Sequence, residues 1–101
     1  MVFNDYSEDR AAIGQLLFYD PILSGNRNIS CATCHHADTF SADALSLGIG
    51  EGGKGIGTRR TVADGAIVKR VPRNAPGLWN IGATEFTSFF HDGRVSVSDA
   101  Y

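Results

Sequence analysis

Two cysteines and a histidine lie within five residues, in the run Cys31-Ala32-Thr33-Cys34-His35, and the chain has no other cysteine. A C-x-x-C-H run is typical of the covalent attachment of a c-type haem. In that chemistry each thiol adds to one vinyl group of the haem, and the adjacent histidine nitrogen binds the iron. The motif therefore predicts one covalent haem c, with Cys31 and Cys34 as attachment points and His35 as the iron ligand.

Three other kinds of site compete with this interpretation. A redox-active pair of thioredoxin type is expected near a β-α-β pattern, which the sequence lacks. A zinc site has donors in Cys31, Cys34, His35 and His36, with His91 as a distant addition, but ligands crowded into one segment rarely form a tetrahedron. A disulfide with two residues between its cysteines is a poor cross-link for a chain of this length. We favour haem, then zinc, then disulfide chemistry.

Length and charge limit the class of protein to which the chain can belong. The chain has 101 residues, is 43% hydrophobic and carries a formal net charge of -2, which together predict one small domain. This charge balance gives no reason to expect a nucleic acid or an anionic membrane as partner, and no apolar run is long enough to cross a bilayer.

The sequence from Met1 to Asp9 is polar and acidic and has no signal-peptide pattern. Because bacteria attach c-haem outside the cytoplasm, we expect a periplasmic or otherwise exported protein whose leader is not present in this chain.

Local signals predict two helices around the motif. Residues 7–19 have apolar positions at helical spacing, with Ser7 as the cap, and Asp20-Pro21 ends that helix. A turn is expected at residues 24–26, and Ser30 is expected to cap a short helix that carries the haem motif.

The second half of the chain predicts little regular structure. Six glycines between Gly48 and Gly57 rule out a stable helix or strand centre and predict a flexible loop near a cofactor edge. A short hairpin is expected to pair Thr61-Val62 with Ile67-Val68 around Asp64-Gly65, and another helix to begin at Ser96 or Ser98. The expected class is mostly α, with short helices and long loops around one covalent haem.

The order of several segments resembles a known family. The segments are Leu16-Leu17-Phe18-Tyr19-Asp20-Pro21-Ile22-Leu23-Ser24, Ile29-Ser30 with the haem motif, Phe40-Ser41-Ala42-Asp43, Ser46-Leu47-Gly48, Arg73-Asn74-Ala75-Pro76 with Asn80, and Phe90-His91-Asp92-Gly93-Arg94. This series, over about residues 16–94, resembles the amino-terminal haem domain of the bacterial dihaem cytochrome c peroxidase family, which includes the MauG-like enzymes.

The resemblance implies a cytochrome c-like fold and a larger protein. Family members have two cytochrome c-like domains with one c-haem each; the amino-terminal haem reacts with peroxide, and the other receives electrons from a donor. Residues 1–101 have one motif, so we expect the amino-terminal half of such a protein, with a second haem domain or chain and a small redox protein as partners. Asn74 matches an asparagine that contributes to an interdomain calcium site in some members.

Three departures from the family pattern affect the expected chemistry. Ile49 stands near the place where some peroxidases have a reversible distal histidine, and His91 stands where the family often has tryptophan. The distal acid–base residue follows Asp-Gly-Arg at a distance that lies beyond Tyr101. The resemblance therefore leaves open whether this chain is an enzyme by itself.

The sixth position on the iron is expected to be open or to hold water. The only methionine is Met1, at a terminus, whereas His91 or His36 could give a bis-histidine site. Arg73 and Arg94 are candidates for holding the haem propionates or for surface pairing with a carboxylate such as Asp92. Aromatic residues are expected in the haem pocket or core, namely Trp79, Phe40, Phe86, Phe89 and Phe90.

Two functions remain after these arguments. One is a peroxide-binding haem domain of a dihaem peroxidase-like oxidoreductase that exchanges electrons with a second haem. The other is a monohaem c-type cytochrome domain that acts only as an electron-transfer relay. The spin state of the iron separates them, because an open site is high-spin and a six-coordinate relay site is low-spin.

Overall fold

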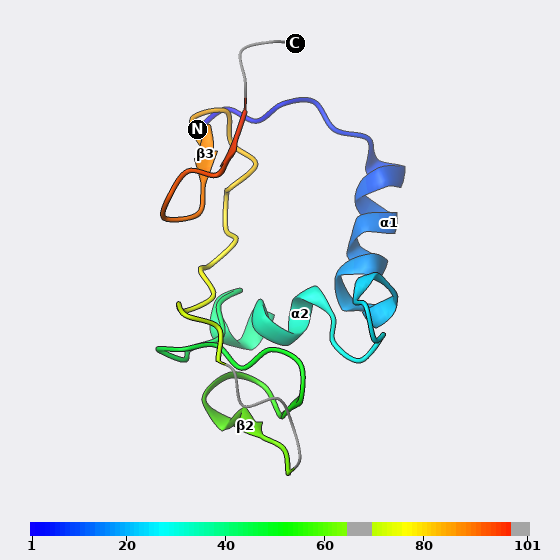
Figure 1. Cartoon of the computed structure of the whole chain (residues 1–101). Coiled ribbons are helices and arrows are strands. Elements are labelled where there is room, and N and C mark those ends of the chain that lie inside the picture. Colours follow the sequence, from blue (N-terminus) through cyan, green and yellow to red (C-terminus); the bar gives the residue numbers. More distant parts are fainter. Residues whose placement is uncertain (65–69, 98–101) are drawn as a thin grey trace.

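The computed structural model describes residues 1–64 and 70–97, and the chain runs around a ring (Figure 1). Helices account for 27% and strands for 13% of the described residues, so the expectation of a mostly α chain is only partly right. The elements in order are α1 (Glu8–Tyr19), η1 (Pro21–Leu23), α2 (Cys31–Cys34), η2 (Ala37–Thr39), β1 (Gly53–Lys54), η3 (Gly57–Arg59), β2 (Thr61–Val62), β3 (Ser88–Phe89) and β4 (Val95–Ser96), where η marks a 3-10 helix.

Both predicted helices form with the expected ends. The Ser7 side chain accepts a hydrogen bond from Arg10 N at 3.4 Å at the start of α1, and the chain becomes extended at Asp20, directly before Pro21. At α2, Ser30 N donates to Thr33 Oγ1 at 3.0 Å, which satisfies one of the free amides at the helix start. The two cysteines of the haem motif therefore lie on a single helical turn, and His35 directly follows it.

The glycine-rich segment pairs in a way that the sequence did not predict. Gly53–Lys54 of β1 pairs antiparallel with Thr61–Val62 of β2, so a short strand does form among the glycines. The hairpin that we expected with Ile67-Val68 is not tested, because those residues lie outside the described part of the chain; within it, β2 pairs with the preceding segment. The pairing turns this segment into a defined lobe at one end of the molecule (Figure 1).

The end of the described chain is a hairpin and not the start of a helix. Ser88–Phe89 of β3 pairs antiparallel with Val95–Ser96 of β4, so the expectation of a helix cap at Ser96 is wrong. Ser98 lies outside the described residues.

The amino-terminal segment closes the ring. Phe3 forms an antiparallel bridge with Ala83, and Thr84 N donates to the carbonyl of Val2 at 2.8 Å. Figure 1 shows this junction beside β3, with α1, α2 and the extended segment after residue 70 completing the circuit. Residues from the two ends of the described chain thus hold the frame together.

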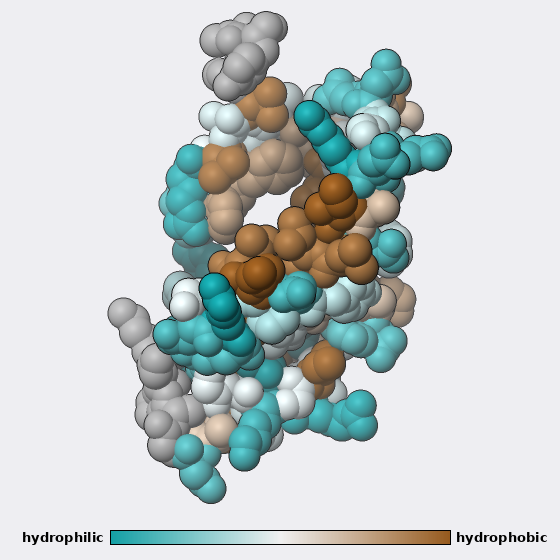
Figure 2. Space-filling view, turned by 90° about the vertical axis from the view of Figure 1, so that its right-hand side faces the viewer, coloured by the Kyte–Doolittle hydropathy of each residue, from teal (hydrophilic) through white to brown (hydrophobic). Residues whose placement is uncertain are grey.

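Few apolar side chains are buried. The buried hydrophobic residues are Ala32, Ile49 and Ala83, and no large side chain among the described residues is fully buried. Figure 2 shows an opening through the molecule with apolar atoms along its rim. On α1, Leu16 is 73% exposed, whereas Leu17 and Phe18 are partly buried, so the described chain covers its apolar face only in part. No helix of residues 1–64 and 70–97 has the length and apolar character needed to cross a membrane.

Candidate functional site

His35 follows α2 and is held by two backbone carbonyls. Its Nδ1 lies 2.9 Å from the carbonyl oxygen of Ser41 and 2.9 Å from that of Pro76. Because both partners are acceptors, Nδ1 carries the proton and donates to them. This tautomer leaves a free lone pair on Nε2, which is the form in which histidine binds a metal, with its other nitrogen donating to a carbonyl.

The carbonyl of Ser41 is positioned by an unusual backbone. Phe40 and Ser41 are consecutive residues in the left-handed region, each with φ of 56°, a conformation that is costly for residues other than glycine. The Ser41 hydroxyl oxygen accepts a hydrogen bond from Leu78 N at 2.7 Å. Ser41 therefore fixes both the imidazole and the loop that follows Pro76.

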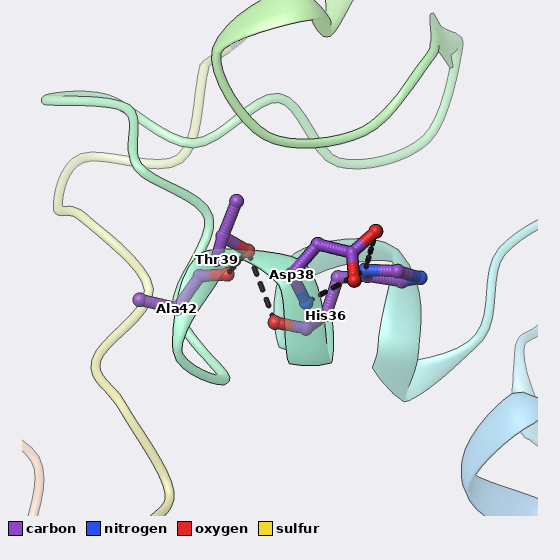
Figure 3. A network of polar contacts seen from close by, with 4 residues as sticks. All are labelled: His36, Asp38, Thr39 and Ala42. Carbon is purple, nitrogen blue, oxygen red and sulfur yellow. Dashed lines mark hydrogen bonds and ion pairs between the residues drawn. The ribbon is translucent and has the colours of Figure 1, made fainter.

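A polar network directly after the motif supports this turn (Figure 3). His36 Nδ1 accepts from Asp38 N at 3.2 Å, and Thr39 Oγ1 lies 3.0 Å from the His36 carbonyl and 2.6 Å from that of Ala42. His36, which we considered as a zinc donor or a second haem ligand, is partly buried and caps η2. The hydrogen bonds of His36 therefore stay within the turn that follows the motif.

The two thiols are free and differ in environment. Cys31 is exposed, whereas Cys34 is half-buried. Burial raises the pKa of the Cys34 thiol; the Arg60 guanidinium opposes this shift, and the Asp43 carboxylate and Cys31 add to it. Cys34 is thus the member of the pair that faces the interior charges of the domain.

Two cavities adjoin His35. The larger has a volume of about 650 Å³ and is lined by Cys34, His35, Asp43, Gly48, Phe90 and the segment 71–76, with His91 and Arg94. The smaller has a volume of about 250 Å³ and is lined by Phe18, Tyr19, His35, Ala37, Ser41, Leu78 and Trp79. The larger volume falls within the range typical of cofactor sites.

The sequence candidates divide between these cavities. Arg73, Asn74, His91 and Arg94 line the larger cavity together with His35, and Trp79 lines the smaller one. Arg94 Nη1 lies 3.3 Å from Asp92 Oδ2, and its guanidinium carbon lies 4.2 Å from the centre of the Phe90 ring, which is the surface pairing we considered.

The expected aromatic residues divide less clearly. None of the five belongs to the buried core, and Phe40 is 79% exposed. Of the five, Phe90 and Trp79 line the cavities beside His35.

The described residues do not form the ligand set that the zinc alternative requires. Across residues 1–64 and 70–97, no three or more histidine, cysteine, aspartate or glutamate side chains gather in a group that could hold a metal ion. His36 lines neither cavity. A structural zinc site would need four converging ligands.

The sequence reasoning missed two buried charged residues, Asp43 and Arg60, which are 2% and 5% exposed. Arg60 donates to the carbonyls of Ile49, Gly50 and Gly55 at 2.6, 2.6 and 2.8 Å. The glycine-rich segment is therefore wrapped around a guanidinium, and this structure replaces the flexible loop that we expected. The available signal was an arginine three residues after the end of a glycine-rich run, whose bare carbonyls can converge on a five-donor fork.

These features fit a covalent haem. Two free thiols and a histidine with one fixed tautomer lie on or next to one helical turn, beside a large cavity and exposed apolar side chains. A flat apolar ring with two acidic groups would cover apolar surface and place negative charge within reach of arginines such as Arg73 and Arg94.

Comparisons with known proteins point to one family. A family model described as di-haem cytochrome c peroxidase matches residues 8–100. The methylamine utilization protein MauG of Methylorubrum extorquens is 30% identical over 97 residues, which are 96% of this chain and 23% of that protein. Cytochrome c551 peroxidase of Pseudomonas aeruginosa is 33% identical over 89 residues, covering 88% of this chain and 21% of that protein.

A third relative is the MauG protein of Paracoccus denitrificans, 37% identical over 93 residues, which cover 84% of this chain and 22% of that protein. The chain therefore spans about a fifth of the length of the curated relatives it matches. No solved structure matches the chain.

Proposed function

This chain belongs to the di-haem cytochrome c peroxidase family, and from that premise we propose that residues 1–101 form its amino-terminal haem domain. In this proposal Cys31 and Cys34 hold one haem c through thioether bonds, and His35 binds the iron. The bound haem supplies one-electron iron chemistry with an open position for peroxide. The second haem domain, in the same protein or another chain, exchanges electrons with this haem. A small redox protein donates electrons to that second domain.

The observation that carries the proposal is the shared hydrogen bond from His35 Nδ1 to the carbonyls of Ser41 and Pro76. It fixes the tautomer and the ring orientation before any metal binds, so Nε2 is ready as a ligand. Donation from Nδ1–H to a carbonyl also raises the basicity of Nε2, which favours electron donation toward the iron.

Other residues of the larger cavity have defined roles in the proposal. Arg73 and Arg94 bind the propionates, because a guanidinium forms paired hydrogen bonds with a carboxylate. Trp79 covers haem surface from the smaller cavity. Asn74 offers an amide oxygen to calcium, whose remaining ligands come from the second domain. Because c-haem is attached outside the bacterial cytoplasm, the proposal includes export to the periplasm.

The second candidate function is electron relay without peroxide chemistry. It is favoured by His91, which lines the same cavity as His35 and could close the open position as a second imidazole ligand. That site would be six-coordinate and low-spin.

Expression in a bacterial host that attaches c-haem tests both functions. We expect the mass of the chain to rise by one haem, and the Cys31→Ala, Cys34→Ala double variant to lose it. The ferric absorption spectrum near neutral pH is expected to be high-spin and to change on peroxide addition. A low-spin spectrum insensitive to peroxide would select the relay, and a wild-type chain without haem would reject both functions.

A further inference from the structure

Two buried charged side chains of opposite sign have no role in the function proposed above; one lines the larger cavity with Cys34, and the other bonds the segment that follows the cavity-lining Gly48. They belong to Arg60 and Asp43, which are 5% and 2% exposed. Burial matters here because a charge in a low-dielectric interior acts more strongly and over a longer range than a charge in water.

The charge of Arg60 is not neutralised by a neighbouring acid. All three of its nitrogens donate to neutral backbone carbonyls, with Nε to Ile49 O and Nη2 to Gly50 O both at 2.6 Å. Among the ion pairs of the described residues none involves Arg60. Gly48, next to Ile49, lines the cavity, so the guanidinium is hydrogen-bonded to the residue that adjoins the cavity wall.

The charge of Asp43 faces the same wall. Asp43 Oδ1 accepts from Leu45 N at 3.1 Å, whereas Oδ2 has no hydrogen-bond partner in the described structure. A side chain at Gly48 would come within 2.8 Å of Oδ2, so this oxygen packs against the bare α-carbon of Gly48. Asp43 and Arg60 thus contact adjacent residues of one segment, and Asp43 lines the cavity together with Cys34.

We propose that Arg60 and Asp43 set the reduction potential of the haem anchored at Cys34, with Arg60 raising it and Asp43 lowering it. The inference rests on the proposed function, since it requires haem at Cys34. Reduction adds one electron to the iron and breaks no bond, so the positive charge of the site falls by one. A nearby cation opposes the more positive oxidised form, and a nearby carboxylate stabilises it. Asp43 lines the same cavity as Cys34, and Arg60 is hydrogen-bonded to Ile49, the neighbour of cavity-lining Gly48.

Redox titration of the haem-loaded chain with dithionite at pH 7 tests the inference. We expect Arg60→Gln to lower the equilibrium constant for reduction of the haem by about tenfold, which for one electron is a reduction potential 59 mV lower. Asp43→Asn is expected to shift the potential upward by a similar amount, and the double variant to lie close to the wild type. Asp43→Glu, which keeps the charge, is expected to keep the wild-type potential.

Exposed neighbours of the same types are matched controls. Arg59→Gln and Asp38→Asn remove charges at exposed positions, so their shifts should be several-fold smaller and should vanish in 1 M salt, where exposed charges are screened. Equal shifts in the buried and exposed variants, or shifts of the same sign for Arg60→Gln and Asp43→Asn, would overturn the inference.

Failure of one variant to load haem leaves the test decisive. If Arg60→Gln fails to fold, the reduction potential of Asp43→Asn still gives the sign and size of the effect, by comparison with the potentials of Asp38→Asn and Asp43→Glu. A wild-type chain that carries no haem would instead reject the proposed function itself, so the two failures are distinguishable.

Discussion

His35 Nδ1 and the carbonyl oxygen of Pro76 lie 2.9 Å apart although 41 residues separate them in the chain. The orientation of the imidazole therefore depends on a loop that is remote in sequence. Ser41 joins the two parts, because its carbonyl accepts from His35 and its hydroxyl oxygen accepts from Leu78 N. Perturbations of that loop should be felt at His35.

Ser41→Ala tests this dependence. The substitution leaves the partly buried Leu78 amide without its acceptor, which should lower the free energy of unfolding by about 1–3 kcal/mol. Urea unfolding of the haem-loaded chain measures the loss. Ser46→Ala, at an exposed serine, should change stability by less than about 0.5 kcal/mol; equal effects in both variants would show that the Ser41 hydroxyl has no supporting role.

Two glycine substitutions should change stability in opposite directions. An alanine Cβ at Gly53 would lie 2.7 Å from the Arg60 guanidinium and from the Ile49 side chain, so Gly53→Ala should cost about 1–3 kcal/mol. Gly14 lies within α1 and a Cβ there meets nothing within 4 Å, so Gly14→Ala should stabilise by about 0.5–1 kcal/mol. Thermal unfolding of the two variants, made in parallel, checks the opposite signs.

Glu51 makes one contact between loops dependent on pH. Hydrogen bonds from the side-chain amides of Asn26 and Asn28 hold the pKa of Glu51 below its ordinary value of 4.5. Because the folded-state pKa is the lower one, the stabilisation is complete above pH 4.5 and is lost as the pH falls through the folded-state value. Nuclear magnetic resonance titration of the Glu51 carboxyl and the two amides should show a common midpoint below 4.5.

Glu51→Gln provides the comparison for that titration. The variant should lose the part of the acid dependence of stability that lies below pH 4.5, whereas Glu85→Gln, at an exposed turn position, should keep it. Retention of the full dependence in Glu51→Gln would assign the acid transition to other groups.

His91→Ala separates the two proposed functions at one residue. If the iron is open, as we expect, the ferric spectrum stays high-spin after the substitution, because His91 is not a ligand. If His91 closes the site, the wild type is low-spin and the variant becomes high-spin. His36→Ala is the control, since His36 lines neither cavity and should leave the spin state unchanged in both cases.

The sequence predicted those parts of the fold that local chemistry decides. The limits of α1 follow from the Ser7 cap and from Asp20-Pro21, and the position of α2 follows from Ser30. These signals act within a few residues, so they can be identified without knowledge of the rest of the chain.

Long-range pairing was not predictable in the same way. We expected Thr61–Val62 to pair with a segment after Asp64-Gly65 that lies outside the described residues, and did not expect its pairing with Gly53–Lys54. The reason lies in Arg60, whose three hydrogen bonds to carbonyls fold the glycine segment back onto its own end. A side chain that organises a loop through backbone carbonyls has no periodic pattern that a sequence could reveal.

The candidate site, like the fold, was predicted only in part from the sequence. The residues of the motif and several cavity residues were named from the sequence, but the two buried charges were not, because burial of Asp43 and Arg60 depends on tertiary packing. Charged residues are rarely buried without partners, so composition argues against finding them there.

The contact of Val2 with Thr84 closes a circuit of the chain that includes the haem motif. When this hydrogen bond breaks, the amino-terminal segment is free to separate from residue 84, and the frequency of that event is a kinetic property of the domain. The exchange of the Thr84 amide proton with deuterium reports it directly.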